Sequence, residues 1–323
     1  MSETLKIEYH KTRDFGKKIN ATIEFIKQNF KPLFKAMLFI AGPPIILGSI
    51  LMAQILDNFM NILTYSTQGL DPELDELMGL IGPAIGAVIF LVIGGTAIVA
   101  VVYDYVILYE KQGKDITVQE VWERTKKSFW RVLGTMLLYV VVLMVAYLIM
   151  LIPTFLLAVI SPALTFIGIL VFYAGAIYVV VTFSLIFIVM AYEQVNFATA
   201  ISRCFQLIKS KWWSTFGLFI VTGLIQSVIS SIFFIPWYVI FIISMLHNTD
   251  ANTFGEPGAI AQVIGTICLL FYLVISYLLY CIPLIAIAFQ YFNLVELKES
   301  KGLMAKIETF GAASTPQDEE EHY

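Results

Sequence analysis

Apolar residues fill long stretches of the chain that contain no charged side chain. Five such stretches occur, at Ala36–Leu56, Met78–Tyr103, Val132–Tyr192, Ser214–Thr249 and Pro257–Val295. A membrane-spanning helix needs about 20 apolar residues to cross about 30 Å of hydrocarbon, and the third and fifth stretches are long enough for more than one helix or for long, tilted helices. When these stretches are divided into helical hairpins, the sequence predicts an all-α polytopic membrane protein with six transmembrane helices. They lie near residues 36–56, 80–103, 132–152, 163–191, 214–240 and 260–292.

Prolines interrupt several of these predicted spans. Gly42-Pro43-Pro44 is expected to bend or break the first span, because proline lacks the amide donor that a helix interior requires. Pro153 and Pro236 lie near the far ends of the third and fifth spans and predict kinks or short interfacial helices there. The glycines of the second span, Gly86 and Gly94 among them, favour close packing against a neighbouring helix.

Composition agrees with the apolar pattern. Of the 323 residues 59% are hydrophobic and only 14% are charged, with a mean hydropathy of +0.83, whereas about a quarter of the residues in a soluble domain are charged. We expect no secretory signal peptide, because the first apolar run begins near Leu33 behind a charged segment without a cleavage site. The first span is therefore interpreted as an uncleaved anchor. The three cysteines predict no disulfide.

Basic residues lie on one side of the predicted membrane. All 20 Lys and Arg residues occur in four segments, namely the first 35 residues, 111–131, 203–211 and 298–306. The connecting loops between these segments carry acids only, Asp57, Asp71, Glu73, Asp75, Glu76, Asp250 and Glu256. Since Lys and Arg remain on the cytoplasmic side of membrane proteins, the sequence predicts a multi-pass protein of the cell membrane with both termini in the cytoplasm.

An internal repeat organises the chain. A shift of 83 residues pairs Tyr109-Glu110 with Tyr192-Glu193, and it also pairs Lys126 with Lys209 and Trp130 with Trp213. With a fainter amino-terminal copy, this predicts three parallel repeats near 17–109, 110–192 and 193–292, each an amphipathic lead-in helix followed by a transmembrane hairpin. Residues 1–310 then form a single six-span domain, and the acidic tail 311–323 is expected to be disordered.

The predicted lead-in helices combine basic and aromatic side chains, which suits the headgroup boundary of a membrane. The residues that we expect to face lipid or a partner protein form a cytoplasmic rim: Trp130, Trp213, Lys126, Lys127, Arg131, Lys209 and Lys211.

One segment resembles a known family. The sequence FATAISRCFQLIKSKWW at Phe197–Trp213 is similar to the repeated motif of the membrane domain that precedes the catalytic domain of some glycerophosphoryl diester phosphodiesterases, and of stand-alone bacterial membrane proteins of uncharacterised function. The matching positions are Glu193, Ala198, Ala200, Arg203, Phe205, Leu207, Lys209 and Trp213, while Cys204 replaces the usual Ser. The chain carries no phosphodiesterase domain, so the resemblance implies a membrane architecture, located in the bacterial cytoplasmic (inner) membrane, and no catalytic residue.

Motifs of enzyme chemistry are missing from the sequence. It contains no H-E-x-x-H, G-x-S-x-G, Walker A or paired-cysteine motif, so we expect no enzyme, no catalytic residue, no cofactor and no metal site. Asp104 is interpreted as an interfacial acid that meets a Lys or Arg of a lead-in helix, with a proton or cation site as the alternative. Glu110 and Glu193 are interpreted as charges at helix amino termini, with docking of a partner or lipid amine as the alternative.

Polar side chains inside the spans are few. Gln226 and Ser230 share one face of the fifth span and, with Gln54, are the first candidates for a polar cavity; bonds between helices would explain them equally. The leading hypothesis is a non-catalytic scaffold or accessory subunit that engages membrane lipids, or other membrane or cytoplasmic proteins, at its cytoplasmic face. The alternative is a transporter or channel for a neutral or amphipathic small molecule. Nothing indicates nucleic-acid binding.

Overall fold

The computed structural model describes residues 6–67, 74–113, 115–247, 259–304 and 307. Within these ranges the regular structure is helical, with no strand. The helices are α1 (Phe15–Ile40), α2 (Gly42–Thr67), α3 (Leu74–Gln112), α4 (Val118–Ile160), α5 (Pro162–Phe183), α6 (Ile186–Glu193), α7 (Phe197–Ile208), α8 (Trp212–His247), α9 (Ala259–Leu279) and α10 (Cys281–Glu299).

Long apolar helices account for most of the chain. Five segments within the described ranges are long and apolar enough to cross a membrane, namely 78–112, 118–160, 164–193, 212–240 and 263–299. The pair α1 and α2 becomes a sixth if it is counted as one span, and it is bent by 60° at its break. These lengths indicate a helical membrane protein.

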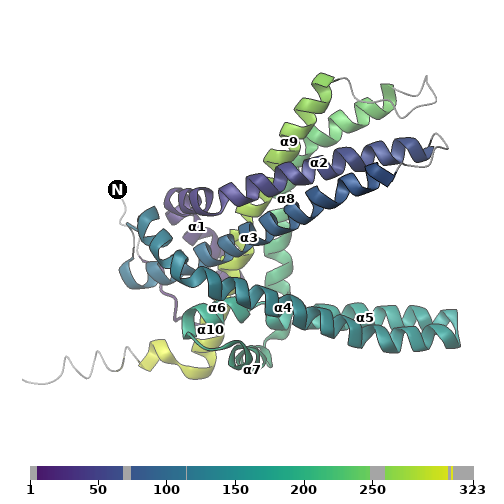
Figure 1. Ribbon diagram of the computed structural model, residues 1–323. Helices are drawn as coiled ribbons and strands as arrows, with labels where there is room; N and C mark the ends of the chain where they lie inside the picture. The colour runs from purple at the N-terminus through teal and green to yellow at the C-terminus, as the bar shows by residue number, and fades with distance from the viewer. Residues whose placement is uncertain (1–5, 68–73, 114, 248–258, 305–306, 308–323) are drawn as a thin grey trace, which may run out of the picture.

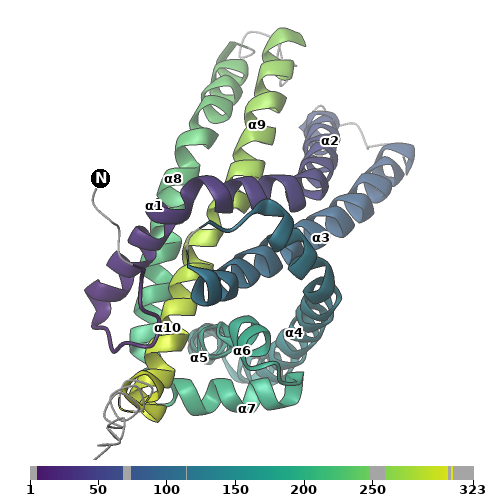
Figure 2. The same cartoon turned by 90° about the vertical axis from the view of Figure 1, so that its left-hand side faces the viewer.

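Three helix hairpins extend from a shared base (Figures 1 and 2). The hairpins pair α2 with α3, α4 with α5, and α8 with α9, while α1, α6, α7 and α10 lie in the base. The described Lys and Arg residues belong to this base or to the helix ends that enter it, and we call it the basic end. The predicted tail 311–323 and the acidic residues Asp71, Glu73, Asp250 and Glu256 lie outside the described residues.

Helix ends follow local sequence signals. The three predicted lead-in helices all begin at a side-chain cap. Asp14 accepts from the amide of Lys17 at 2.9 Å, Asn196 accepts from that of Thr199 at 2.8 Å, and Thr117 forms a reciprocal capping box with Glu120. The predicted break at Gly42-Pro43-Pro44 is confirmed, since α1 ends at Ile40 and α2 begins at Gly42.

The lead-in helices are not alike in the structure. The second is continuous with its span as α4, whereas the third, α7, is separated from α8 by a short turn. Short interfacial helices at Pro153 and Pro236 do not form, because α4 and α8 continue through both prolines. The fourth and sixth spans are each divided, by a turn after Phe183 and another after Leu279.

Close packing of the α2–α3 hairpin depends on glycine. A Cβ atom added to Gly94 would lie 2.5 Å from the Ile45 side chain, and one added to Gly86 would lie 2.7 Å from that of Leu51. The predicted packing role of these two glycines is confirmed.

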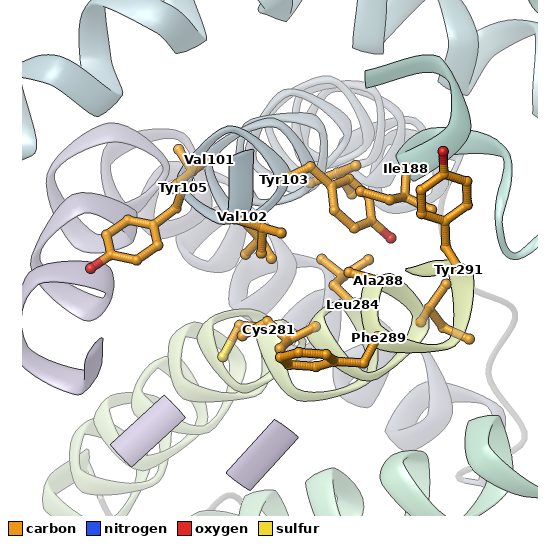
Figure 3. Close-up of a cluster of buried hydrophobic side chains, with 14 of the residues drawn as sticks. Val101, Val102, Tyr103, Tyr105, Ile188, Cys281, Leu284, Ala288, Phe289 and Tyr291 are labelled. Atoms are coloured by element: carbon orange, nitrogen blue, oxygen red, sulfur yellow. The ribbon is translucent and has the colours of Figure 1, made fainter. Parts of the chain in front are cut away.

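The core of the protein lies at the basic end and surrounds α10. Every side chain from Cys281 to Glu296 is buried, as expected of a helix that is covered on all sides. Figure 3 shows Tyr103 and Tyr105 of α3 with Cys281, Leu284, Ala288, Phe289 and Tyr291 of α10. By contrast, apolar side chains along the α4–α5 hairpin are exposed, among them Leu148, Ile152, Phe155, Ile160, Phe166 and Val171. Such a surface suits contact with lipid chains.

Candidate functional site

The amino-terminal segment 6–14 crosses the basic end and inserts Tyr9 into its core. The Tyr9 side chain is only 4% exposed. Its hydroxyl donates to the Val106 carbonyl at 3.0 Å, and its ring stacks on Phe292 at 4.7 Å between centroids. Burial raises the pKa of the Tyr9 phenol well above its usual value, so the group stays a neutral donor. Sequence reasoning missed this segment, because nothing in its polar composition identifies one buried aromatic residue.

Glutamate and tyrosine side chains link α3 to two helices of the base, α6 and α10. Tyr192 of α6 donates to Glu110 of α3 at 2.9 Å, and Tyr291 of α10 donates to Glu193 of α6 at 2.8 Å. The interpretation of these glutamates as amino-terminal helix charges is wrong, since Glu193 ends α6 and Glu110 lies in the last turn of α3. A carboxylate there is opposed by the helix dipole, so these side chains depend on partners that are distant in sequence.

Arg203 of α7 neutralises Glu193 and a second carboxylate, Glu299. Its Nε atom lies 3.0 Å from Glu193, and its Nη2 atom contacts Glu299 of α10. Burial alone would lower the pKa of the Arg203 guanidinium, but the hydrogen bonds that it donates to Glu299 and Glu193 outweigh burial and hold the pKa above its usual value. The guanidinium therefore joins α6, α7 and α10 as a permanent cation.

A buried amine lies at the junction of α1, α8 and α10. The Lys18 Nζ donates to Ser214 Oγ and to Gln290 Oε1, both at 2.8 Å. The Gln290 amide in turn donates to Thr215 Oγ1 at 2.8 Å. Each polar group of this junction thus has a partner, and the network ties the first and last helices of the bundle together.

Asp104 lies beside a cavity of about 220 Å³ between α3, α4 and α6. Arg124 Nε donates to one carboxylate oxygen of Asp104 at 2.8 Å, and the Ser128 hydroxyl donates to the other. The prediction that Asp104 meets a basic residue of a lead-in helix is therefore confirmed. Lys127 and Arg131 line the same cavity, and with Arg124 and Ser128 they occupy one face of α4, because residues three, four and seven apart share a helical face.

The predicted rim residues lie on the surface of the basic end. Trp130 and Trp213 are 75% and 77% exposed, and the four rim lysines, Lys126, Lys127, Lys209 and Lys211, are exposed as well. Arg131 differs, since it is half-buried and donates to the Val195 carbonyl at 3.0 Å and to the Gln194 side chain. The structure divides the rim into an α4 group beside the cavity and a group at the turn between α7 and α8.

The three interior polar candidates do not form one site. Gln226 of α8 donates to the Ser276 carbonyl of α9 at 3.4 Å, a weak bond between the two helices of one hairpin. Ser230 is buried, whereas Gln54 of α2 is exposed. The cavity beside Asp104, the groove along α4 and the hollow around residues 6–13 are lined by other residues than Gln54, Gln226 and Ser230. This arrangement favours a role in hydrogen bonding between helices over a role in lining a substrate path.

No group of three or more metal-ligating side chains occurs within the part of the chain that the structure describes. Comparison with protein-family models, with curated proteins and with solved structures gave no match.

The reactivity of Cys204 tests the packing of α7 against the base. The side chain lies on the buried face of α7 with no exposed surface, and burial raises the pKa of its thiol to about 12. Because the thiolate is the reactive species, Cys204 in a variant without Cys268 and Cys281 should resist maleimide at pH 7.5 and react once denatured. The control protein lacks Cys204, Cys268 and Cys281 and carries one new cysteine at the exposed position Ser210. This cysteine should react with maleimide in the folded protein. Equal labelling rates for the two folded proteins would contradict the placement of α7.

Proposed function

We propose that this chain is a non-catalytic scaffold or accessory subunit of the bacterial cytoplasmic membrane, and that its basic end engages anionic lipid headgroups and partner proteins. In this proposal the membrane is crossed six times, with α1 and α2 counted as one bent span, and both termini lie in the cytoplasm. The observation that carries the proposal is the joint exposure of Trp130 and Trp213 beside lysines at the same end of the bundle.

Membrane physics supports the surface role of that end. Tryptophan prefers the boundary between hydrocarbon and water, and each Lys or Arg near an anionic leaflet contributes roughly 1 kcal/mol of attraction. Lys126 lies over the Trp122 ring at 5.4 Å, so one basic side chain is already held against an aromatic face. The apolar hairpins beyond this end expose mainly hydrocarbon side chains.

The three-repeat architecture remains part of the proposal. Its support is that each lead-in helix begins at a side-chain cap and precedes a hairpin, and that Glu110 and Glu193, one repeat apart, each accept from a tyrosine of another helix at the basic end. The resemblance to the membrane domain of glycerophosphoryl diester phosphodiesterases is consistent with such repeats and contributes no activity.

A transporter or channel for a neutral or amphipathic small molecule stays the second hypothesis. Its requirement is a continuous polar path along the hairpins, whereas the described cavities lie at the basic end. We therefore favour the surface role.

The lipids that accompany the protein test the proposal. After gentle solubilisation and purification in neutral detergent, we expect the ratio of anionic to zwitterionic phospholipid to exceed that of the source membrane several-fold. The reason is that headgroups held by several basic side chains exchange slowly with detergent. Mass spectrometry of extracted lipid measures the ratio, and a membrane protein without a basic end, purified in parallel, is the control. A ratio equal to that of the source membrane would reject lipid engagement.

Orientation is tested separately. In a cysteine-free background, a single cysteine at Asn252 should react with an impermeant maleimide added outside intact cells. A single cysteine at Lys301 should react only after the membrane is permeabilised, because the proposal places residue 301 in the cytoplasm. Labelling of Lys301→Cys from the outside would overturn the orientation.

A further inference from the structure

The cavity between α3, α4 and α6 has an excess of positive charge. Asp104 is its one carboxylate, and this group is already paired with Arg124 at 2.8 Å. Lys127 and Arg131 are therefore two cations beyond neutrality. Lys127 forms no hydrogen bond or ion pair with any described residue. An arrangement with more cations than carboxylates favours an anionic ligand.

A buried tyrosine in the cavity wall has a hydroxyl without a partner. Tyr103 lines the cavity and is 1% exposed, and its hydroxyl has no hydrogen-bond partner among the described residues. Figure 3 shows Tyr103 extending from α3 towards Ile188 and Ala288. Neither Ile188 nor Ala288 lines the cavity, so the Tyr103 ring contributes to the cavity wall while its hydroxyl points towards the core.

The backbone at the edge of the cavity is strained. Gln194, directly after α6, has a left-handed φ of 56°, a region that favours glycine. Its side chain accepts from Arg131, so the strained turn holds this guanidinium at the rim of the cavity. Strain of this kind often accompanies binding sites.

An apolar groove continues from the cavity along the surface of α4. Cavity and groove share Arg131, Thr135, Met190 and Gln194, and the groove extends past Trp130, Gly134 and Leu138. A Cβ atom added to Gly134 would meet no atom within 4 Å, so the groove is open at this point. Beyond it, the exposed apolar face of the α4–α5 hairpin begins. Positive charge at one end and hydrocarbon at the other match an amphipathic anion.

We propose that this cavity and groove form a site for one anionic phospholipid. The phosphate lies in the cavity, where Lys127 and Arg131 neutralise it, and an acyl chain follows the groove over Gly134 towards the α4–α5 hairpin. The volume of about 220 Å³ far exceeds the roughly 10–15 Å³ that one water requires, so a polyatomic anion can enter. This inference rests on the proposed function and narrows its lipid contact to a single site.

Calorimetric titration of the purified full chain in neutral detergent tests the site with three probes: dihexanoyl phosphatidic acid, dihexanoyl phosphatidylcholine and inorganic phosphate. Phosphatidic acid should bind with a stoichiometry of one and at least tenfold more tightly than either other probe. Lys127→Gln should weaken its binding roughly 10- to 100-fold, as expected when a charge-assisted contact is lost. Since Lys127 is exposed and without a partner, this variant should keep the thermal unfolding midpoint of the wild type.

Gly134→Leu tests the acyl groove. Leucine there fills open space in the groove and should weaken phosphatidic acid about tenfold while leaving inorganic phosphate binding unchanged. Gly223→Leu is the matched control, because Gly223 also lies within a helix, meets no atom within 4 Å and lines neither cavity nor groove; it should bind as the wild type does.

Three outcomes would overturn the inference. If Lys127→Gln bound phosphatidic acid as tightly as the wild type, the cavity would not be the phosphate site. If Gly134→Leu did so, the groove would not be the acyl-chain site. Equal affinity for inorganic phosphate and phosphatidic acid would assign the cavity to soluble phosphate. If the site failed in these ways while anionic lipid still gathered near Trp213, which lines neither the cavity nor the groove, the proposed function would stand without the site. If the purified protein neither bound phosphatidic acid at this site nor enriched anionic lipid, both the site and the proposed function would be rejected.

Discussion

Replacing Tyr9 by Ala is expected to destabilise the protein by about 3–5 kcal/mol, the range for truncating a large aromatic side chain in a packed core. Tyr9 lies between Phe289, Phe292 and Tyr109, with ring centroids 5.6, 4.7 and 6.0 Å away. The variant leaves a cavity among these rings and also removes the donor to the Val106 carbonyl. Thermal unfolding in detergent, followed by circular dichroism, measures the loss.

Two further variants separate the contributions at this position. Tyr9→Phe keeps the ring and removes only the hydroxyl, so its cost should be about 1 kcal/mol. Lys11→Ala alters an exposed side chain of the same segment and should change stability by less than about 0.5 kcal/mol. If Tyr9→Ala unfolded at the wild-type temperature, the amino-terminal segment would not belong to the core.

Neutralising the rim is the second large expected effect. Changing Lys126, Lys127, Arg131, Lys209 and Lys211 to Gln should return the co-purified lipid ratio close to that of the source membrane. Each charge contributes roughly 1 kcal/mol near an anionic leaflet, which is about fivefold in a binding constant. The five positions together should therefore dominate the preference for anionic lipid, while folded protein still accumulates in the membrane.

The interior polar pair supplies the comparison for this experiment. Gln226→Met and Ser230→Ala preserve approximate size, remove the bond from Gln226 to the Ser276 carbonyl and leave every rim charge in place. The double variant Gln226→Met/Ser230→Ala should leave the lipid ratio unchanged. If this double variant abolished a cellular activity of the protein and the five-charge variant left that activity intact, the transporter hypothesis would replace the scaffold hypothesis.

The sequence predicted those features that depend on local composition. The helical membrane class follows from charge-free runs, the break after Ile40 follows from Gly42-Pro43-Pro44, and the pairing of Asp104 follows from the cost of an unpaired carboxylate at a membrane boundary. In the first two cases the physical cause lies within a few residues or along one helix, and in the third the partner Arg124 comes from the next helix along the chain.

Features that depend on contacts distant in sequence could not be predicted. The bond from Tyr192 to Glu110 joins positions 82 apart, and the bond from Lys18 to Gln290 joins positions 272 apart. Periodicity identifies which face of a helix is apolar but does not identify which helix covers it. The insertion of Tyr9 has the same origin, because its burial depends on a space formed by α1, α3 and α10.

Tryptophan quenching in nanodiscs tests the central claim, that the basic end gathers anionic lipid. Variants that retain only Trp130, only Trp213 or only Trp237 report on separate places, and Trp237 lies about 36 Å along α8 from Trp213 at 1.5 Å per residue. Brominated phosphatidylglycerol should quench Trp130 and Trp213 with a relative binding constant several-fold above that of brominated phosphatidylcholine, and 0.5 M salt should reduce this preference, since ions screen exposed charges. At Trp237 the constant should be close to one. Equal constants at all three tryptophans would contradict the account.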